Sequence, residues 1–384
     1  MSLPRSAARL PDELIVDIFR SNVLSNSDLF RASLVSRRFV DDVNRTLYEH
    51  CKIHLIDLET ETERYIYSTQ TWKLLRTLID HKDLAKFVRS LEFKLDEEEV
   101  QPGELEDYWG METTTEIAVS GAFRLMPNVK TVEFGKLWDP EGENLEAMSD
   151  YDIKGLVLRE ISGETLQYVA QNFPQLEHLA TIGIVEIGET TAASTRTIPT
   201  RLQSLSIKEC YSEIQSGLIS ANTSTLRNLE LPLEHAVRLT YSTFTALEGL
   251  RITSDSSYGR SADAGRNSIN FWKSLSDSPS LRTLSFGSSR FSSSYEKALF
   301  GGSNQTEHQR RNPIATLRNL RFEGEIHSKR ADFLLSGPLA STLNRVTIST
   351  RYQDPQLDPW ELDKLRSLAS ICELRGIELA FADD

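Results

Sequence analysis

A six-residue pattern, apolar-x-x-apolar-x-apolar, recurs along most of the chain. Val88, Leu91 and Phe93 form the first copy, and the later copies start 21 to 41 residues apart. The last three positions of each copy alternate between apolar and polar, which is the period of a short β-strand with one buried face. The sequence therefore predicts eleven short strands. The copies start at Val88, Val129, Ile153, Leu176, Leu202, Leu226, Leu247, Leu281, Leu317, Leu343 and Leu374.

Helical patterns of apolar residues lie between several of these strands, at residues 113–125, 164–172, 269–275 and 360–371. A strand, a loop and a helix cannot bury their apolar face alone, so successive units stack and their strands join a parallel sheet. The pattern resembles the leucine-rich repeat. Its usual Asn or Cys, eight residues after the first Leu, is matched only by Cys210. The resemblance implies an irregular α/β solenoid with a parallel sheet on its concave side and helices outside.

The first 50 residues follow a different pattern, which predicts three short helices. Leu10-Pro11-Asp12-Glu13-Leu14 places proline and two acids at a helix entry, where fixed φ and the helix dipole favour them. This helix should run to about Ser21. A second should start at a Ser27-Asp28 cap, and a third should carry Phe39, Val43 and Leu47 on one stripe. So small a unit buries little surface and needs a neighbour.

The same residues resemble an F-box, the helical motif of SCF-type ubiquitin-ligase substrate receptors. The matching segments are Leu10-Pro11-x-Glu13-Leu14, Ile18-Phe19, Asp28-Leu29, Ser33 to Phe39 and Leu47-Tyr48. Phe39 stands where the family often has Trp, and the connection at residues 21–27 is longer. The resemblance implies docking on a Skp-type adaptor, and through it on cullin and RING subunits. The residues expected to include the docking surface are Leu10, Pro11, Leu14, Ile15, Ile18, Leu29, Leu34 and Val35.

Some of those apolar positions must belong to the internal core, and the sequence alone does not sort them. The alternative is that the whole stripe packs only against the linker and the first repeats. We predict four segments: an N-terminal tail (residues 1–9), the F-box-like motif (10–50), a linker that caps the solenoid (51–87) and the repeat solenoid (88–384).

Charge and composition limit the possible partners. The chain has 56 acidic and 43 basic residues, a net charge of −13. This excess argues against nucleic acid or an anionic membrane as a partner. Residues 92–152 carry a local net charge of −13, which indicates a solvated acidic segment or a docking surface for a basic partner. No apolar run is long enough to span a bilayer, and we expect a cytoplasmic and/or nuclear protein.

The sequence carries no motif for catalysis or cofactor binding. The nucleophile-elbow, P-loop, dinucleotide-binding and HExxH patterns are all absent. The densest metal-like cluster is His50-Cys51-x-x-His54, which we interpret as linker packing. We therefore expect no catalytic residue, no metal and no cofactor. A hydrolase or transferase site in the loops at residues 254–267 or 287–312 is the enzymatic alternative.

Positions three, five and seven of each copy should face away from the core. A row of basic residues occupies these positions in the middle and later repeats, and the side chains Glu230, Glu323 and Glu378 share the same rows. The row could bind an acidic or phosphorylated peptide, because arginine offers a fork of donors to carboxylate or phosphate. The alternative is that these charges only keep an exposed sheet soluble. The candidate substrate-binding residues are Arg159, Lys208, Arg251, Arg321 and Arg345.

By resemblance, the function is that of a non-catalytic substrate receptor of a ubiquitin ligase. One end would bind the adaptor and the other would hold a target protein near the ubiquitin-conjugating enzyme. The alternative is a repeat scaffold that binds proteins without directing ubiquitylation. The sequence leaves open the substrate, a requirement for phosphorylation and a small molecule that bridges the partners.

Overall fold

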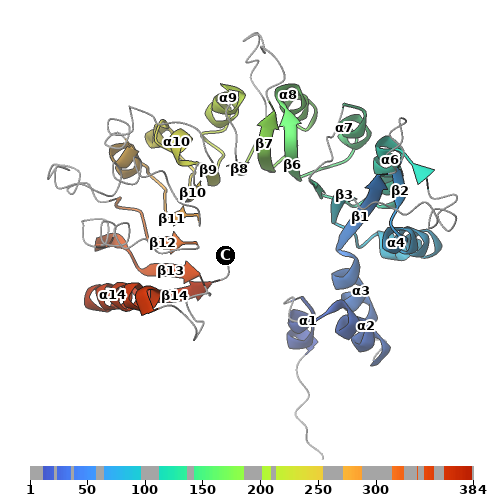
Figure 1. Ribbon diagram of the computed structural model, residues 1–384, viewed down its shortest axis with the longest axis horizontal. Helices are drawn as coiled ribbons and strands as arrows, with labels where there is room; N and C mark the ends of the chain where they lie inside the picture. Colours follow the sequence, from blue (N-terminus) through green and yellow to red (C-terminus); the bar gives the residue numbers. More distant parts are fainter. Residues whose placement is uncertain are drawn as a thin grey trace, which may run out of the picture. The chain divides into compact units, whose positions relative to one another are not determined.

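The protein is described by a computed structural model, drawn in Figure 1. It divides into two compact units, residues 1–160 and 161–384. The described residues are 12–20, 24–35, 39–57, 65–96, 112–135, 142–185, 201–208, 213–253, 271–287, 314–323, 335, 341–349 and 359–382. The loops suggested for an enzymatic site fall mainly in ranges 254–270 and 288–313, which lie outside these residues, as does Cys210.

The first unit opens with the three predicted helices. Phe19, Leu29 and Val43 supply one buried side chain from each helix and form their common core. Phe39, just before the third helix, packs its ring edge-on against Phe19 with the centroids 5.7 Å apart. The helices are α1 (Asp12–Arg20), α2 (Asn26–Val35) and α3 (Val40–Tyr48).

The capping residue of the second helix lies two residues before the predicted Ser27-Asp28 cap, and the helix begins at Asn26. The backbone N–H of Asp28 donates to Ser25 Oγ, and that hydroxyl donates to Asp28 Oδ2. Ser25 therefore caps α2, because its side chain satisfies an N–H group that the first helical turn leaves unpaired. The hydrogen bond from Ser25 also lowers the pKa of the Asp28 carboxyl.

A mainly parallel sheet follows in the first unit, with strand order β4-β2-β1-β3-β5-β6. Strands β1, β3, β5 and β6 are parallel, whereas β2 and β4 are antiparallel to their neighbours. The strands are β1 (His50–Asp57), β2 (Tyr65–Tyr67), β3 (Ser90–Asp96), β4 (Glu112–Thr113), β5 (Thr131–Phe134) and β6 (Gly155–Ser162). The helices are α4 (Thr69–Asp80), α5 (Lys82–Ala85), α6 (Thr115–Leu125) and α7 (Gly142–Ser149).

The segment that we expected to be a linker begins with a strand of this sheet. Cys51 lies opposite Leu91 and Ile53 opposite Phe93, so β1 repeats the register of the first predicted copy. The far edge of β1 is covered by β2 and then by β4. An unpaired edge strand invites association with other chains, and these short antiparallel strands cover it here.

The second unit continues the same architecture with eight parallel strands, in the order in which they occur along the chain. In Figure 1, helices α8, α9, α10 and α14 lie along one side of these strands. The strands are β7 (His178–Val185), β8 (Ser204–Lys208), β9 (Asn228–Pro232), β10 (Gly249–Thr253), β11 (Thr283–Phe286), β12 (Asn319–Phe322), β13 (Arg345–Ser349) and β14 (Glu378–Ala382). The helices are α8 (Gly163–Asn172), α9 (Glu213–Ala221), α10 (Leu233–Ala236), the 3₁₀ turn η3 (Tyr241–Thr243), residues 271–276 and α14 (Pro359–Arg375).

One backbone hydrogen-bond pattern recurs through both units. The carbonyl of Arg227 accepts the N–H groups of Glu248 and Gly249 at the start of the next strand. The carbonyls of Arg89 and Arg282 accept two N–H groups from their next strands in the same way. Because these bonds recur at the second position of successive copies, the strands that they join align in one register. The predicted α/β fold with a parallel sheet is confirmed.

The last predicted copy is wrong in register. Leu379 lies opposite Val346, so it occupies the fourth position of the pattern rather than the sixth. Leu374, predicted at the first position, is 86% exposed near the end of α14. Gly376, with φ +67°, ends this helix in the left-handed conformation that glycine adopts without strain. The helix therefore runs further than predicted, and the strand starts later.

Candidate functional site

Positions three, five and seven carry the predicted basic row; we call the face that they form on the second unit's sheet the open face. Each predicted cation lies beside a carboxylate of its own unit. Arg345 Nη2 on β13 is 2.8 Å from Glu378 Oε1 on β14. In the first unit, Arg159 Nη2 on β6 is 3.0 Å from Glu133 Oε1 on β5. These two pairs are separate from the remaining three cations.

Those three cations share two carboxylates and form what we call the Arg251 network. Glu230 Oε1 lies 3.5 Å from Lys208 Nζ and 3.3 Å from Arg251 Nη1. Glu323 is paired with Arg251 Nη2, and its Oε1 lies 3.2 Å from Arg321 Nε. Glu323 is only 5% exposed. The acids that we had treated as balancing charges therefore hold the predicted binding residues in place.

A cleft of about 410 Å³ lies on the open face beside the Arg251 network, across strands β8 to β12. Its floor consists of small residues, because Gly249, Thr283 and Ser285 are the open-face residues at its centre. Asn228 and Asn319 stand on the two flanking strands. The cleft was not predicted from the sequence. It depends on small side chains at the outward-facing positions, and only the charged residues at those positions were used as a prediction of binding.

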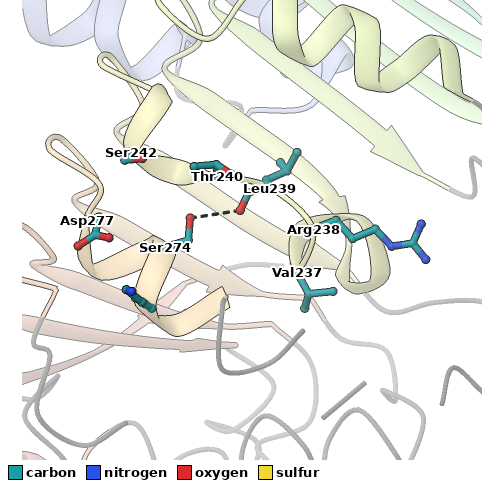
Figure 2. A pocket seen from close by; sticks show the side chains of 8 residues that line it. Val237, Arg238, Leu239, Thr240, Ser242, Ser274 and Asp277 are labelled. Carbon is teal, nitrogen blue, oxygen red and sulfur yellow. Dashed lines mark hydrogen bonds between the residues drawn. The ribbon is translucent and has the colours of Figure 1, made fainter. Parts of the chain in front are cut away.

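A second depression, of about 430 Å³, lies beside η3 and helical residues 271–276. Figure 2 shows the Ser274 hydroxyl directed at the carbonyl of Leu239, to which it donates at 3.2 Å. Ser274 Oγ also accepts a hydrogen bond from the backbone N–H of Tyr241 at 2.6 Å. Ser274 thus joins two consecutive repeats, and we assign it a structural role.

The helical module at the start of the chain exposes apolar side chains on two helices. Ile18 on α1 is 43% exposed and Leu34 on α2 is 73% exposed. Ile15 is partly buried, whereas Leu29 is 3% exposed in the core. Ile18 and Leu34 are thus the predicted docking residues that reach the surface. Of the other predictions, Leu10 and Pro11 lie outside the described residues, and the side chains of Leu14 and Val35 are not described.

The sequence profile of the F-box-like family matches residues 7–53. This segment is an F-box-like domain. No curated protein matches the chain. The match spans the three helices α1 to α3 and the first residues of β1.

The F-box-like domain continues directly into the sheet of the first unit. Its last helix, α3, contacts both β1 and α5. The guanidinium of Arg45 lies over the ring of Phe87, 6.0 Å from the centroid, a geometry that attracts a cation to an aromatic face. Cys51 on β1 is buried, and burial raises the pKa of its thiol to about 12. These contacts supply the neighbour that so small a helical domain needs.

Among the described residues, no group of three or more His, Cys, Asp and Glu side chains is arranged to hold a metal ion. In the same part of the chain, no helix is both long and apolar enough to cross a membrane.

Proposed function

We propose that the chain is the substrate-recognition subunit of an SCF-type ubiquitin ligase. The F-box-like domain would bind a Skp-type adaptor, and through it cullin and RING subunits. The sheet repeats would act as an irregular leucine-rich-repeat solenoid that holds a target protein. The chain would transfer nothing itself and would act by proximity, in the cytoplasm and/or the nucleus.

The observation that carries this proposal is the family match over a module that leaves Ile18 and Leu34 at its surface. A hydrophobic side chain that is 73% exposed gains from burial in a partner, on the order of 1.5 to 3 kcal/mol for complete burial. The core residues Phe19 and Val43 face inward and hold the helices that present this surface.

Coexpression with a Skp-type adaptor, followed by size-exclusion chromatography, tests the adaptor contact. The intact chain should elute with the adaptor in equal amounts, and the double variant Ile18→Asp, Leu34→Asp should elute alone. Ile79→Asp is the matched control, because Ile79 is 55% exposed on α4 and lies outside the matched segment. Circular dichroism checks that each variant is folded. Adaptor binding by the folded double variant would contradict the docking surface.

Ubiquitylation is tested separately by adding cullin and RING subunits to the purified complex. A substrate receptor recruits both, and a target protein that binds the repeats gains ubiquitin only when the chain is present. If the adaptor binds but cullin is absent from the complex, the protein is a repeat scaffold instead.

A further inference from the structure

We propose that the cleft on the open face binds a tyrosine side chain from an extended segment of a partner protein. The inference rests on the proposed function, because it names what the repeats would hold. Four features of the cleft carry it: its floor of small residues, its arginine wall, one hydroxyl open to the cleft and its balanced charge.

The floor is flat because β10 contributes a glycine at its centre. A Cβ atom at Gly249 would lie 2.7 Å from Asn228 Oδ1, so a side chain here would displace the Asn228 amide and take up space on the floor of the cleft. A glycine within a strand often marks a place where a ligand approaches the backbone closely. The cleft volume of about 410 Å³ is in the range of small-ligand sites and is large enough for one aromatic side chain.

Arg251 forms the wall at the carboxyl end of the cleft. Glu323 lies two strands away, directly after β12, so the arginine crosses β11 between Ser285 and Gly287, which are both small. Its two terminal nitrogens are committed to Glu230 and Glu323, yet its side chain remains 39% exposed. An incoming carboxylate would have to compete with these two acids. An aromatic ring instead uses the face of a guanidinium, which edge-on ion pairs leave open.

Ser285 supplies a hydrogen-bonding group without a partner. It is 7% exposed, lines the cleft and makes no side-chain hydrogen bond among the described residues. The hydroxyl is therefore open to the cleft, and a phenol can both donate to it and accept from it. This feature favours tyrosine over phenylalanine.

The charges around the cleft nearly cancel. Arg282 and Glu248 line its rim, and the Arg251 network combines three cations with two carboxylates. An ionic ligand gains little Coulomb energy from so balanced a site. A neutral ring with a polar tip suits it better.

Selection of random 12-residue peptides displayed on phage, on the full chain with and without the adaptor, tests the inference. We expect tyrosine to be enriched at one position. Replacing that tyrosine with alanine in a selected peptide should weaken binding by about tenfold or more. Two variants of the chain should each reduce peptide binding by a similar factor. Arg251→Lys keeps the positive charge but removes the planar guanidinium, and Gly249→Leu places a large side chain on the floor of the cleft.

Arg366→Met is the matched control and should bind like the original chain, because Arg366 pairs with Asp363 on α14, outside the cleft. Arg251→Lys should fold, since Glu230 keeps Lys208 and Glu323 keeps Arg321. Enrichment of acidic peptides, or no enrichment of tyrosine, overturns the inference. Neither outcome of the peptide selection bears on adaptor binding. Coelution with the adaptor in size-exclusion chromatography tests the proposed function separately.

Discussion

Arg251 on β10 and Glu323 after β12 form an ion pair across the intervening strand β11. Both carboxylates that bind Arg251 also bind another cation, so the network links β8 through β12. Long-range side-chain bonds of this kind supplement the backbone ladder. They matter most where the carboxylate is buried, because an ion that has lost its water needs a partner.

Glu323→Ala should therefore lower the free energy of unfolding of the second unit. We expect a loss of about 1 to 3 kcal/mol, which is less than for a fully buried pair because water reaches both arginines. Arg251 and Arg321 would also repel one another across the vacated space. Urea unfolding followed by fluorescence measures the effect. Glu378→Ala, which breaks a half-exposed pair, should change stability by no more than about 0.5 kcal/mol, and equal effects would refute the argument.

Phe19→Ala should unfold the F-box-like domain while the sheet stays folded. Phe19 is 6% exposed and packs against Phe39, so its removal leaves a cavity that costs about 3 to 5 kcal/mol. A three-helix module has little stability to lose. Limited proteolysis should cut the variant before residue 49 and spare the sheet. Ile18→Ala, at an exposed position, should resist cleavage like the original chain. If Phe19→Ala also resists cleavage, the core around Phe19 does not determine whether the F-box-like domain is folded.

Periodicity predicted the strands because the buried positions of one copy lie opposite the same positions of the next copy. It failed at Leu374, since an apolar residue at the end of a helix gives the same spacing as the first position of a strand. It also missed β1, where Cys51 and Ile53 continue the register without a leucine. The five candidate cations were found from their positions alone. Their pairing with carboxylates depends on which side chains meet across strands, and Arg251 reaches past its nearest neighbour.

The docking residues show the same limit. The apolar stripe of α1 and α2 could be read from the sequence, but which of its members are core could not. Leu29 is buried and Leu34 exposed, although both are leucines of one helix. Packing of α2 on α3 decides this difference, and the rotation of a short helix is set by that contact rather than by its own periodicity.

Tyr241 should make the second unit sensitive to alkali. Its ring is fully buried, and its hydroxyl donates to the carbonyl of Ala236 at 3.0 Å. Burial raises the pKa of this phenol above its usual value of about 10. A raised pKa in the folded state means that its stabilising contribution is complete below pH of about 10 and declines as the pH rises further.

Comparing the stability of the original chain with that of Tyr241→Phe separates the effect of this phenol from that of the lysines, whose ordinary pKa lies in the same pH range. At pH 7 the variant should lose about 0.5 to 1.5 kcal/mol, the value of one hydrogen bond. Between about pH 9.5 and 11 the original chain should lose stability more steeply than the variant, so their difference shrinks. Urea unfolding across this range measures both curves. Parallel curves would show that Tyr241 does not ionise on unfolding.

Cys51 should resist alkylation as long as the first unit is folded. The thiolate is the reactive form, and with a pKa of about 12 only about one thiol in ten thousand is ionised at pH 8. Burial also keeps the reagent away, since the side chain lies in β1 with 4% exposure. Iodoacetamide followed by peptide mass spectrometry should label Cys51 slowly in buffer and completely in urea. Because β1 follows α3 directly, labelling that is fast in buffer would show that the junction between the F-box-like domain and the sheet opens readily, which contradicts the packing described for it.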